Sequence, residues 1–322
     1  MILSESWLRE WVNPDLGSHE LAHRLTMAGL EVDAVTALAE GLSGVVVAEI
    51  VAAQQHPDAD KLKVCSVNTG SDTVQIVCGA PNAEVGLKAP LAQPGDKLPG
   101  GVKIKKAKLR GVESQGMLCS AAELTLSEDH DGLLALASDA PVGKGITEYL
   151  DLDDRLIEIG LTPNRADCLS VLGVARDLAV VIDLPFNEEV SASVEPALDE
   201  TFPVTVLSPE KCPRYLGRVI RDVDINRPTP LFMVERLRRS GIRSIDPVVD
   251  ITNYVMLEIG QPLHAFNLEA LEGGIVVREA QPNEALTLLD GQSREMTAGT
   301  LMIADEVKPL AMAGIMGGEG SG

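Results

Sequence analysis

Aromatic residues are scarce in this sequence: they make up 3% of its 322 residues, and residues 41–148 contain no Phe, Tyr or Trp. Proteins that hold bare single strands of nucleic acid usually stack the bases on aromatic rings. Residues 41–148 therefore lack the side chains that such a binding surface needs.

Long apolar runs and clustered cysteines are missing as well. No stretch approaches the roughly 18 uncharged apolar residues of a membrane span. Charged Glu5, Arg9 and Glu10 stand where a secretory signal would be apolar, so we expect a cytoplasmic protein with no membrane partner. The cysteines are odd in number and far apart, which fits neither a disulfide framework nor a Cys-x-x-Cys metal site. We expect reduced, mostly buried thiols at Cys65, Cys78, Cys119, Cys168 and Cys212.

Basic residues are few, with 27 Lys and Arg against 48 Asp and Glu and a net charge of −21. This balance argues against a general polyanion binder, and we expect no DNA partner. One segment differs, because residues 97–112 hold six bases and no acid. We call five of these bases the basic strip: Lys103, Lys105, Lys106, Lys108 and Arg110.

Mutual repulsion along the basic strip would be relieved by an anionic partner, and RNA phosphate is the natural candidate on a small barrel. A solvated strand edge that blocks aggregation is an equally good interpretation of the strip alone. Without aromatic residues, any RNA contact should reach the backbone, weaken with salt, and favour a folded RNA over a bare single strand.

The length predicts about two or three domains. In the first 40 residues, Ser18 is a candidate N-cap for a helix that ends at Gly29, and residues 30–35 alternate as a strand does. Short segments rich in Val and Ile then predict a small all-β barrel over residues 41–148. We expect its strands at residues 44–50, 61–67, 73–78 and 103–110.

Helical spacing returns over residues 169–182, so mixed α and β sequence flanks the predicted barrel on both sides. Insertion of the barrel into one discontinuous domain explains this. Residues 186–200 are acidic and aperiodic, as in a linker. Thr229-Pro230 and Asp246-Pro247 predict helix starts, and Asp290-Gly291 predicts a hairpin turn. The apolar run 310–316 has no obvious partner after it, so we expect the natural chain to continue beyond Gly322.

Four other motifs remain to be interpreted. His56-Pro-Asp-Ala-Asp60 contains residue types that can ligate a metal but is better explained as a turn. His264 follows a helix in an apolar setting, where a lone histidine is usually a satisfied core residue. The arginines of residues 236–243 are most simply a solvated helix face, and Gly314–Gly318 would allow close backbone approach to a ligand.

Ten motifs in one order resemble the N-terminal part of bacterial phenylalanine–tRNA ligase β subunits. The motifs lie at Ser6–Val12, Thr26–Asp33, His56–Leu62, Val77–Asn82, Lys105–Gly111, Gly116–Cys119, Thr162–Cys168, Cys212–Tyr215, Val248–Tyr254 and Gly260–Phe266. The resemblance covers essentially the whole sequence, whereas His-Pro-Asp-Ala-Asp alone would mark only an OB-type tRNA-binding domain.

The resemblance implies a multidomain α+β protein. Residues 1–40 with 150–200 would form a split α+β domain, and residues 41–148 an inserted OB-fold tRNA-binding barrel. Residues 205–322 would form the first part of an α/β editing domain of B3/B4 type, truncated here. The family enzyme is a cytoplasmic α2β2 tetramer that attaches phenylalanine to tRNA-Phe with ATP and Mg²⁺. Its synthetic site lies in the α subunit, and we expect no metal, ATP or Mg²⁺ bound by this stretch.

The β subunit of the family also hydrolyses tyrosine wrongly attached to tRNA-Phe. The resemblance assigns three residues of that editing pocket here. His264 would position the tyrosyl ester or the hydrolytic water, Arg243 would hold the tRNA end or shape the pocket, and Gly317 would admit the substrate. A phenylalanine pocket cannot strongly reject an added hydroxyl, with discrimination on the order of 10²-fold, so a second site is needed.

Two other functions remain open at this stage. A stand-alone OB-fold tRNA-binding or RNA-chaperone module is the second hypothesis, although the segments that flank residues 41–148 argue against it. A free-standing hydrolase of mischarged tRNA is the third, and the family's remaining pocket residues, which lie beyond Gly322, argue against that one.

Overall fold

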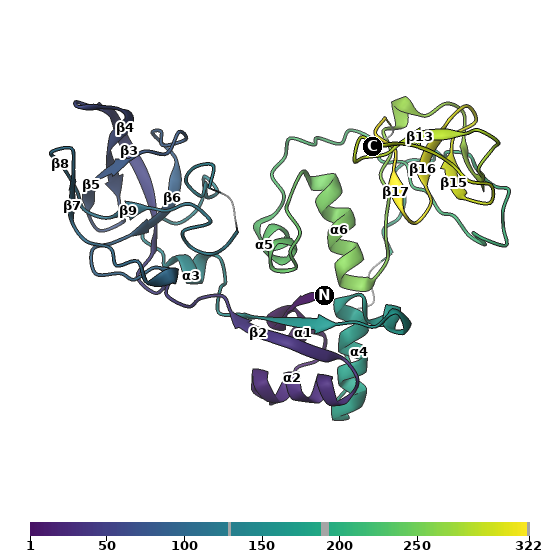
Figure 1. Cartoon of the computed structure of the whole chain (residues 1–322), viewed down its shortest axis with the longest axis horizontal. Helices are drawn as coiled ribbons and strands as arrows, with labels where there is room; N and C mark the ends of the chain where they lie inside the picture. The colour runs from purple at the N-terminus through teal and green to yellow at the C-terminus, as the bar shows by residue number, and fades with distance from the viewer. Residues whose placement is uncertain (128–129, 188–192, 321–322) are drawn as a thin grey trace. The chain divides into compact units, whose positions relative to one another are not determined.

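The computed structural model describes residues 1–127, 130–187 and 193–320, and it divides into two compact units (Figure 1). The first unit contains Met1–Glu188, Pro230–Ser244 and Leu257–Gly260. The second contains Glu189–Thr229, Ile245–Met256 and Gln261–Gly322. No helix among the described residues is both long enough and apolar enough to cross a membrane.

A three-stranded antiparallel sheet lies near the start of the first unit, in the order β1 (Ile2–Ser4), β10 (Arg155–Gly160) and β2 (Glu31–Ala37). Its strands come from both sides of residues 41–148, so the chain leaves this sheet and returns to it. Three helices contact one another or the sheet: α1 (Glu5–Trp11), α2 (Ser18–Met27) and α4 (Val171–Ile182). Their inward side chains are fully buried, and each such side chain contributes roughly 1.5–3 kcal/mol.

The first 40 residues hold more structure than the sequence indicated. The expected helix and strand are present as α2 and β2, but β1 and α1 precede them. The predicted N-cap was wrong by one residue, because Gly17 is the N-cap of α2 and makes no side-chain cap bond. Ser18 is the first helical residue, and its hydroxyl accepts a hydrogen bond from Arg155 instead.

A five-stranded antiparallel sheet is the main sheet of residues 45–145. Its order is β5 (Thr73–Cys78), β4 (Ala59–Asn68), β3 (Val46–His56), β6 (Lys88–Ala92) and β9 (Met117–Leu118). Three of the expected strands are confirmed as β3, β4 and β5. Hydrogen bonds also join β5 to the residues before β9, including Gln115 N–H to the Gln75 carbonyl at 2.8 Å. Two buried apolar clusters fill the interior, and a short helix α3 (Ile146–Tyr149) follows.

The predicted strand over residues 103–110 was mostly wrong. Lys103 forms an isolated bridge with Lys97, and Ile104 turns into the core and binds the Asp96 carbonyl. A strand begins only at β7 (Ala107–Leu109), which forms a hairpin with β8 (Val112–Ser114). Ile104, which lies among the basic residues, explains why the strand does not begin at Lys103. Its side chain is buried in the core, and this fixes the path of the segment before the hairpin starts. A 3-10 turn, η1 (Pro99–Gly101), precedes it.

The second unit is built on a five-stranded sheet in the order β11 (Val204–Val206), β12 (Ile275–Glu279), β15 (Leu301–Ala304), β16 (Pro309–Met312) and β17 (Met316–Gly317). Only the β11–β12 pair is parallel. The predicted Asp-Gly turn is confirmed between β13 (Ala285–Thr287) and β14 (Ser293–Glu295). The apolar run at 310–316 does have partners, because β16 pairs with β15 before it and β17 after it.

Two helices follow the linker region, α5 (Leu231–Arg239) and α6 (Pro247–Ile259). The expected start of α6 is confirmed, because the Asp246 carboxylate accepts hydrogen bonds from the Val248 and Val249 N–H groups. The cap predicted for α5 was wrong: Pro230 is the N-cap, and Thr229 donates its hydroxyl to Asp250 at 2.5 Å. Of the linker predicted at 186–200, residues 193–200 carry no helix or strand, and 188–192 lie outside the described residues.

The arginines of α5 are not a solvated face. Arg239 is 4% exposed and belongs to the first unit, where its Nη1 lies 2.9 Å from the buried carboxylate of Asp154. Its Nη2 donates to the carbonyls of Leu150 and Asp151. The same carboxylate accepts the Ser4 hydroxyl at 2.6 Å, so helix α5, the residues before β10 and the end of β1 meet at one ionic centre.

Candidate functional site

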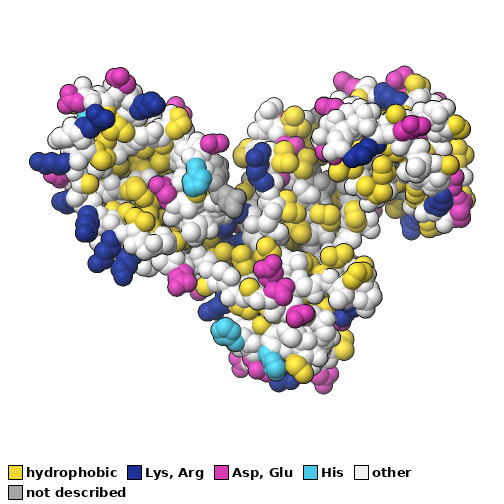
Figure 2. All heavy atoms as spheres, in the orientation of Figure 1, with side chains coloured by type: hydrophobic (Ala, Val, Ile, Leu, Met, Phe, Trp, Pro, Cys, Tyr) yellow, Lys and Arg dark blue, Asp and Glu magenta, His cyan; other side chains and the backbone are white. Residues whose placement is uncertain are grey.

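The basic strip lies on the surface of the first unit with every member exposed. In the part of the chain that the structure describes, none of its five side chains has a carboxylate within 4.0 Å or a hydrogen-bond partner. Glu113 stands across the β7–β8 ladder from Lys108 and still forms no ion pair with it. Figure 2 shows Lys and Arg side chains along the edge of the molecule where Figure 1 labels β7 and β8. The strip therefore presents uncompensated positive charge.

The tip of the β7–β8 hairpin places one cation at a strained backbone position. Arg110 and Gly111 form the two-residue turn, with φ angles of 45° and 87°. A turn of this kind needs positive φ at both residues and usually takes Asn-Gly or Gly-Gly. An arginine there costs about 1–2 kcal/mol of backbone energy relative to glycine. The chain retains a long, exposed cationic side chain at the tip of the hairpin despite that cost.

His56 connects the hairpin to the turn between β3 and β4. Its ring is 2% exposed, so its nitrogens depend on protein partners. Nδ1 accepts a hydrogen bond from the Asp58 N–H at 3.0 Å, which leaves Nε2 as the protonated nitrogen. Nε2 donates to the Leu109 carbonyl at 3.1 Å, one residue before Arg110. The motif at 56–60 is thus a turn, as expected, with Pro57 and Asp58 at its tip. Its histidine braces the hairpin of the basic strip.

A hollow of about 670 Å³ lies beside the basic strip. Two strip lysines, Lys103 and Lys105, line the hollow, whereas Lys106 and Lys108 do not. Sequence reasoning did not find the hollow, because its walls come from separate places in the sequence. The apolar and small residues of the wall include Val77, Ala80, Pro81, Val102, Ala107, Leu109, Leu118 and Leu133.

In the second unit, His264 and Gly317 lie together. A Cβ added at Gly317 would stand 3.3 Å from Nε2 of His264 and 3.2 Å from Cδ1 of Leu289, so a side chain there would crowd the imidazole. The His264 ring stacks on Phe266, with ring centroids 4.1 Å apart. His264 is exposed and has no hydrogen-bond partner among the described residues, so the interpretation as a satisfied core histidine was wrong.

Partial enclosure by these neighbours lowers the pKa of His264 below its ordinary value, because burial disfavours the charged imidazolium. The imidazole is therefore neutral near pH 7, with a free nitrogen lone pair. Arg243, the third residue assigned to this pocket, is exposed and belongs to the first unit. Its role at the pocket stays a prediction.

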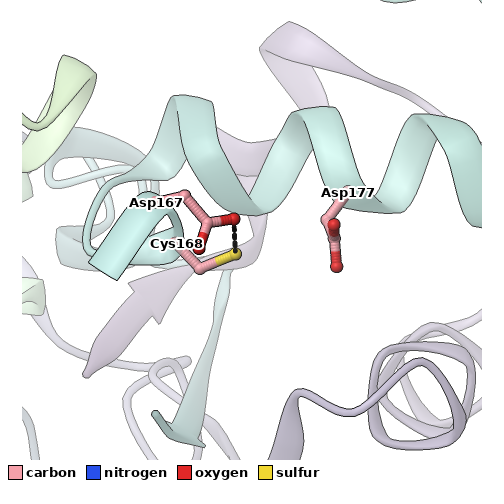
Figure 3. A group of neighbouring side chains, drawn as sticks. All are labelled: Asp167, Cys168 and Asp177. Carbon is pink, nitrogen blue, oxygen red and sulfur yellow. Dashed lines mark hydrogen bonds between the residues drawn. The ribbon is translucent and has the colours of Figure 1, made fainter. Parts of the chain in front are cut away.

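One cluster consists of side chains that could ligate a metal ion. The cluster lies where α4 begins and contains Asp167, Cys168 and Asp177 (Figure 3). Its potential ligand atoms all lie within 4.8 Å of one another, and it is the only such group of three in the described ranges. The guanidinium of Arg165 already binds all three, at 3.2, 2.9 and 3.0 Å respectively. Burial and the bond to Asp167 raise the pKa of Cys168 to about 11, so no thiolate is available. The cluster is an internal ion pair that fixes the turn before α4.

Comparisons with known proteins agree with this geometry. Residues 45–145 match the family model described as "Putative tRNA binding domain", and residues 211–322 match the "B3/4 domain". The first match contains the basic strip, and the second contains His264 and Gly317. The B3/4 match also includes Pro230–Ser244, which the structure groups with the first unit.

Similarity extends over the entire chain in curated relatives. The phenylalanine–tRNA ligase beta subunit of Pseudomonas putida is 63% identical over 322 residues, covering 100% of this chain and 41% of that protein. The subunit of the same name from Hahella chejuensis is 58% identical with the same coverage. The whole chain is thus similar to the N-terminal part of phenylalanine–tRNA ligase beta subunits. It spans 41% of the length of these beta subunits.

Among solved structures, a methionyl-tRNA-synthetase-related protein from Pyrococcus horikoshii is 29% identical over 32% of this chain and 87% of its own. The TM-score of 0.24 is too low to support a structural argument. The similarity to beta subunits thus rests on sequence identity and on the two domain matches.

Proposed function

We propose that this chain is the tRNA-binding and editing portion of a phenylalanine–tRNA ligase β subunit. Residues 41–148 would be an OB-fold barrel inserted into a split α+β domain of residues 1–40 and 150–200, and residues 205–322 would be part of a B3/B4 editing domain. The whole enzyme would be a cytoplasmic α2β2 tetramer that charges tRNA-Phe. ATP and Mg²⁺ would act at the synthetic site of the α subunit.

The observation that carries tRNA binding is the exposed basic strip, which has no ion-pair partner within residues 1–127, 130–187 and 193–320 of a chain of net charge −21. A strip that only blocked strand-edge aggregation would need no strained Arg110 at the hairpin tip. Phosphate contact gives a definite salt dependence, because each neutralised phosphate changes the slope of log K against log salt by about 0.9. Five contacts would give a steep fall in affinity between low and moderate salt.

A tRNA titration at several salt concentrations tests this part of the proposal. Unmodified tRNA-Phe should bind this chain weakly, and binding should weaken steeply as salt rises. Binding that does not respond to salt would remove phosphate contact as the mechanism.

The editing role is supported by the contact between His264 and Gly317. A neutral imidazole can position or deprotonate a water that attacks the ester of tyrosyl-tRNA-Phe. Gly317 keeps this side of the ring free of a side chain, since an added Cβ would stand 3.3 Å from Nε2 of His264. Arg243 would hold the tRNA end or shape the pocket.

Deacylation of tyrosyl-tRNA-Phe by this chain, beside the full-length α2β2 enzyme, tests the editing role. In the full enzyme, His264→Ala should leave phenylalanine charging nearly intact and let tyrosyl-tRNA-Phe accumulate. Because the pKa of His264 is lowered, the wild-type rate should persist as pH falls to about 6.5, the ordinary histidine value, and decline only below it. Normal deacylation by His264→Ala would exclude this histidine from the site.

A stand-alone RNA-binding module remains the alternative function. One observation weighs against it, because the buried Arg239–Asp154 contact ties a helix from the B3/4 match to the first unit. A stand-alone tRNA-binding barrel would not require this contact with a later segment of the chain.

A further inference from the structure

The hollow beside the basic strip divides the strip into two groups with different surroundings. Lys103 and Lys105 are part of its lining, whereas Lys106, Lys108 and Arg110 are not. Contact with an RNA backbone alone would need only a row of cations on a convex surface. A cavity beside the row, with two of the cations in its wall, is suited to something that projects from the backbone.

Apolar surface in this polycationic segment supports the same conclusion. Val102 is 54% exposed and Leu109 is 41% exposed, and both line the hollow. Apolar side chains at a strongly charged surface gain free energy when a ligand covers them, at about 25 cal/mol per Å² of area removed from water. Phosphate and ribose are too polar to supply that cover, but the face of a nucleobase can.

The lining also offers an acceptor for a base. One oxygen of the Glu123 carboxylate, Oε2, accepts hydrogen bonds from the Ser120 N–H at 2.6 Å and the Ser120 hydroxyl at 2.9 Å. The other, Oε1, has no partner among the residues the structure describes. A carboxylate oxygen repels phosphate and accepts from the N–H groups of a base edge. The hollow thus combines cations for phosphate, apolar cover, and an acceptor for base N–H groups.

We propose that this hollow binds one unpaired nucleotide of a folded RNA, with its phosphate held by Lys103 and Lys105 and its base covered by Val102 and Leu109. The inference rests on the proposed RNA-binding function and names the feature of the RNA that the site reads. The volume of about 670 Å³ lies within the roughly 300–1,000 Å³ of small-ligand sites. A paired base cannot enter, because its edge and faces are occupied within the helix. Burial replaces the aromatic stacking that this region lacks.

Three RNA hairpins test the inference with the 322-residue chain. The first is fully paired, the second carries one bulged uridine, and the third carries an abasic nucleotide at the bulge. Affinity is measured by fluorescence anisotropy at low salt. The bulged hairpin should bind about fivefold tighter than the paired one, a gain of about 1 kcal/mol. The abasic hairpin, which keeps the phosphate and the kink, should lose that gain.

A matched pair of variants assigns the gain to the hollow. Ala107 is an exposed residue of β7 in the lining, and Ala107→Leu should fill part of the hollow. This variant should bind the paired hairpin normally and lose the preference for the bulge. Ala34→Leu makes the same change at an exposed position of β2 outside the lining and should keep the preference. Thermal unfolding of both variants checks that the fold is retained.

The outcomes separate the inference from the proposed function. Equal binding of the bulged and abasic hairpins overturns the nucleotide site and leaves RNA binding standing. A preference for the bulge that survives Ala107→Leu also overturns the site. Failure to bind any of the three hairpins, or tRNA-Phe, overturns the proposed function and the site together.

Discussion

Two clusters of basic residues in this chain differ in their exposure to solvent and in their ion-pair partners. The basic strip has every side chain exposed and no ion-pair partner among the described residues. The arginines of α5 are all engaged: Arg236 pairs with Glu10, Arg238 lies 2.7 Å from Glu235, and Arg239 is buried against Asp154. In the sequence the two clusters differ little, since each is a short run of cations.

The difference lies in the carboxylates that the fold brings near each cluster. A buried guanidinium needs a partner because an unpaired charge in the interior costs several kcal/mol. An exposed lysine needs none, because water solvates it. In a chain with 48 acidic residues, a cation cluster that the fold leaves without partners is the better candidate for an external anion. The following variants test this distinction between internal and external partners.

Loss of the buried partner should have the largest effect. Arg239→Leu leaves Asp154 buried without its cation and should lower the free energy of unfolding of the first unit by about 3–5 kcal/mol. Urea denaturation measures this change. The double variant Arg239→Leu with Asp154→Leu should recover much of the loss, since no unpaired charge remains. A single variant that costs less than about 1 kcal/mol would contradict the internal role of the α5 arginines.

Removal of the external cations should affect binding and not folding. Changing Lys105, Lys106 and Lys108 together to Ala should weaken tRNA binding at low salt by roughly 10- to 100-fold. The slope of log K against log salt should also become shallower, by the equivalent of up to about three phosphate contacts. Lys144→Ala is the matched control, since Lys144 is already paired with Glu148 at 3.2 Å. It should change affinity little. An unchanged affinity in the triple variant would leave the strip as a solvated edge.

The brace of the hairpin should have an intermediate effect on binding. His56→Ala removes the bond to the Leu109 carbonyl, worth about 1 kcal/mol, and should weaken tRNA binding several-fold while every lysine remains. Hydrogen exchange of the β7–β8 amides should rise in parallel. His56→Asn keeps an acceptor for the Asp58 N–H but cannot reach Leu109, so it should resemble the alanine variant in binding. His19→Ala, on the exposed face of α2, is the control.

Stability should respond least to single changes in the strip. Lys105→Ala should alter the free energy of unfolding by less than about 0.5 kcal/mol. It could even raise that free energy, because like charges repel along the segment. Arg236→Ala should lower it by about 0.5–1 kcal/mol, since the guanidinium lies 4.8 Å from the centre of the Trp7 ring. Comparable losses from both variants would remove the contrast between the two clusters.

Much of the fold could be predicted from local patterns. The helices at α2, α4 and α6, the strands β3, β4 and β5, and the Asp290-Gly291 turn follow from periodicity and turn residues. The sequence predicts one strand over residues 103–110, whereas only Ala107–Leu109 form a strand. Ile104, a single buried residue, decides the actual path, and burial of one side chain depends on tertiary contacts.

The site could be predicted only where one segment carries the chemistry. The basic strip is contiguous in sequence, so its exposure could be anticipated, although its lack of partners could not. The pairing of Arg239 with Asp154 joins residues 85 positions apart. The hollow joins Val77, Lys103 and Leu133 from separate segments. Neither arrangement has a local signal. Family resemblance assigned His264 and Gly317 to one pocket, and no spacing in the sequence points to that pair.

Helix α5 has a consequence for any attempt to divide this polypeptide. Residues 230–244 return to the unit that contains the N-terminus, while the residues on either side of them belong to the other unit. If the chain were divided anywhere between residues 200 and 229, Asp154 would lie in one product and Arg239 in the other. Protein engineers who wish to graft the later region onto another scaffold must therefore remove or replace this helix, and a recombination event that exchanged the two regions would have met the same obstacle.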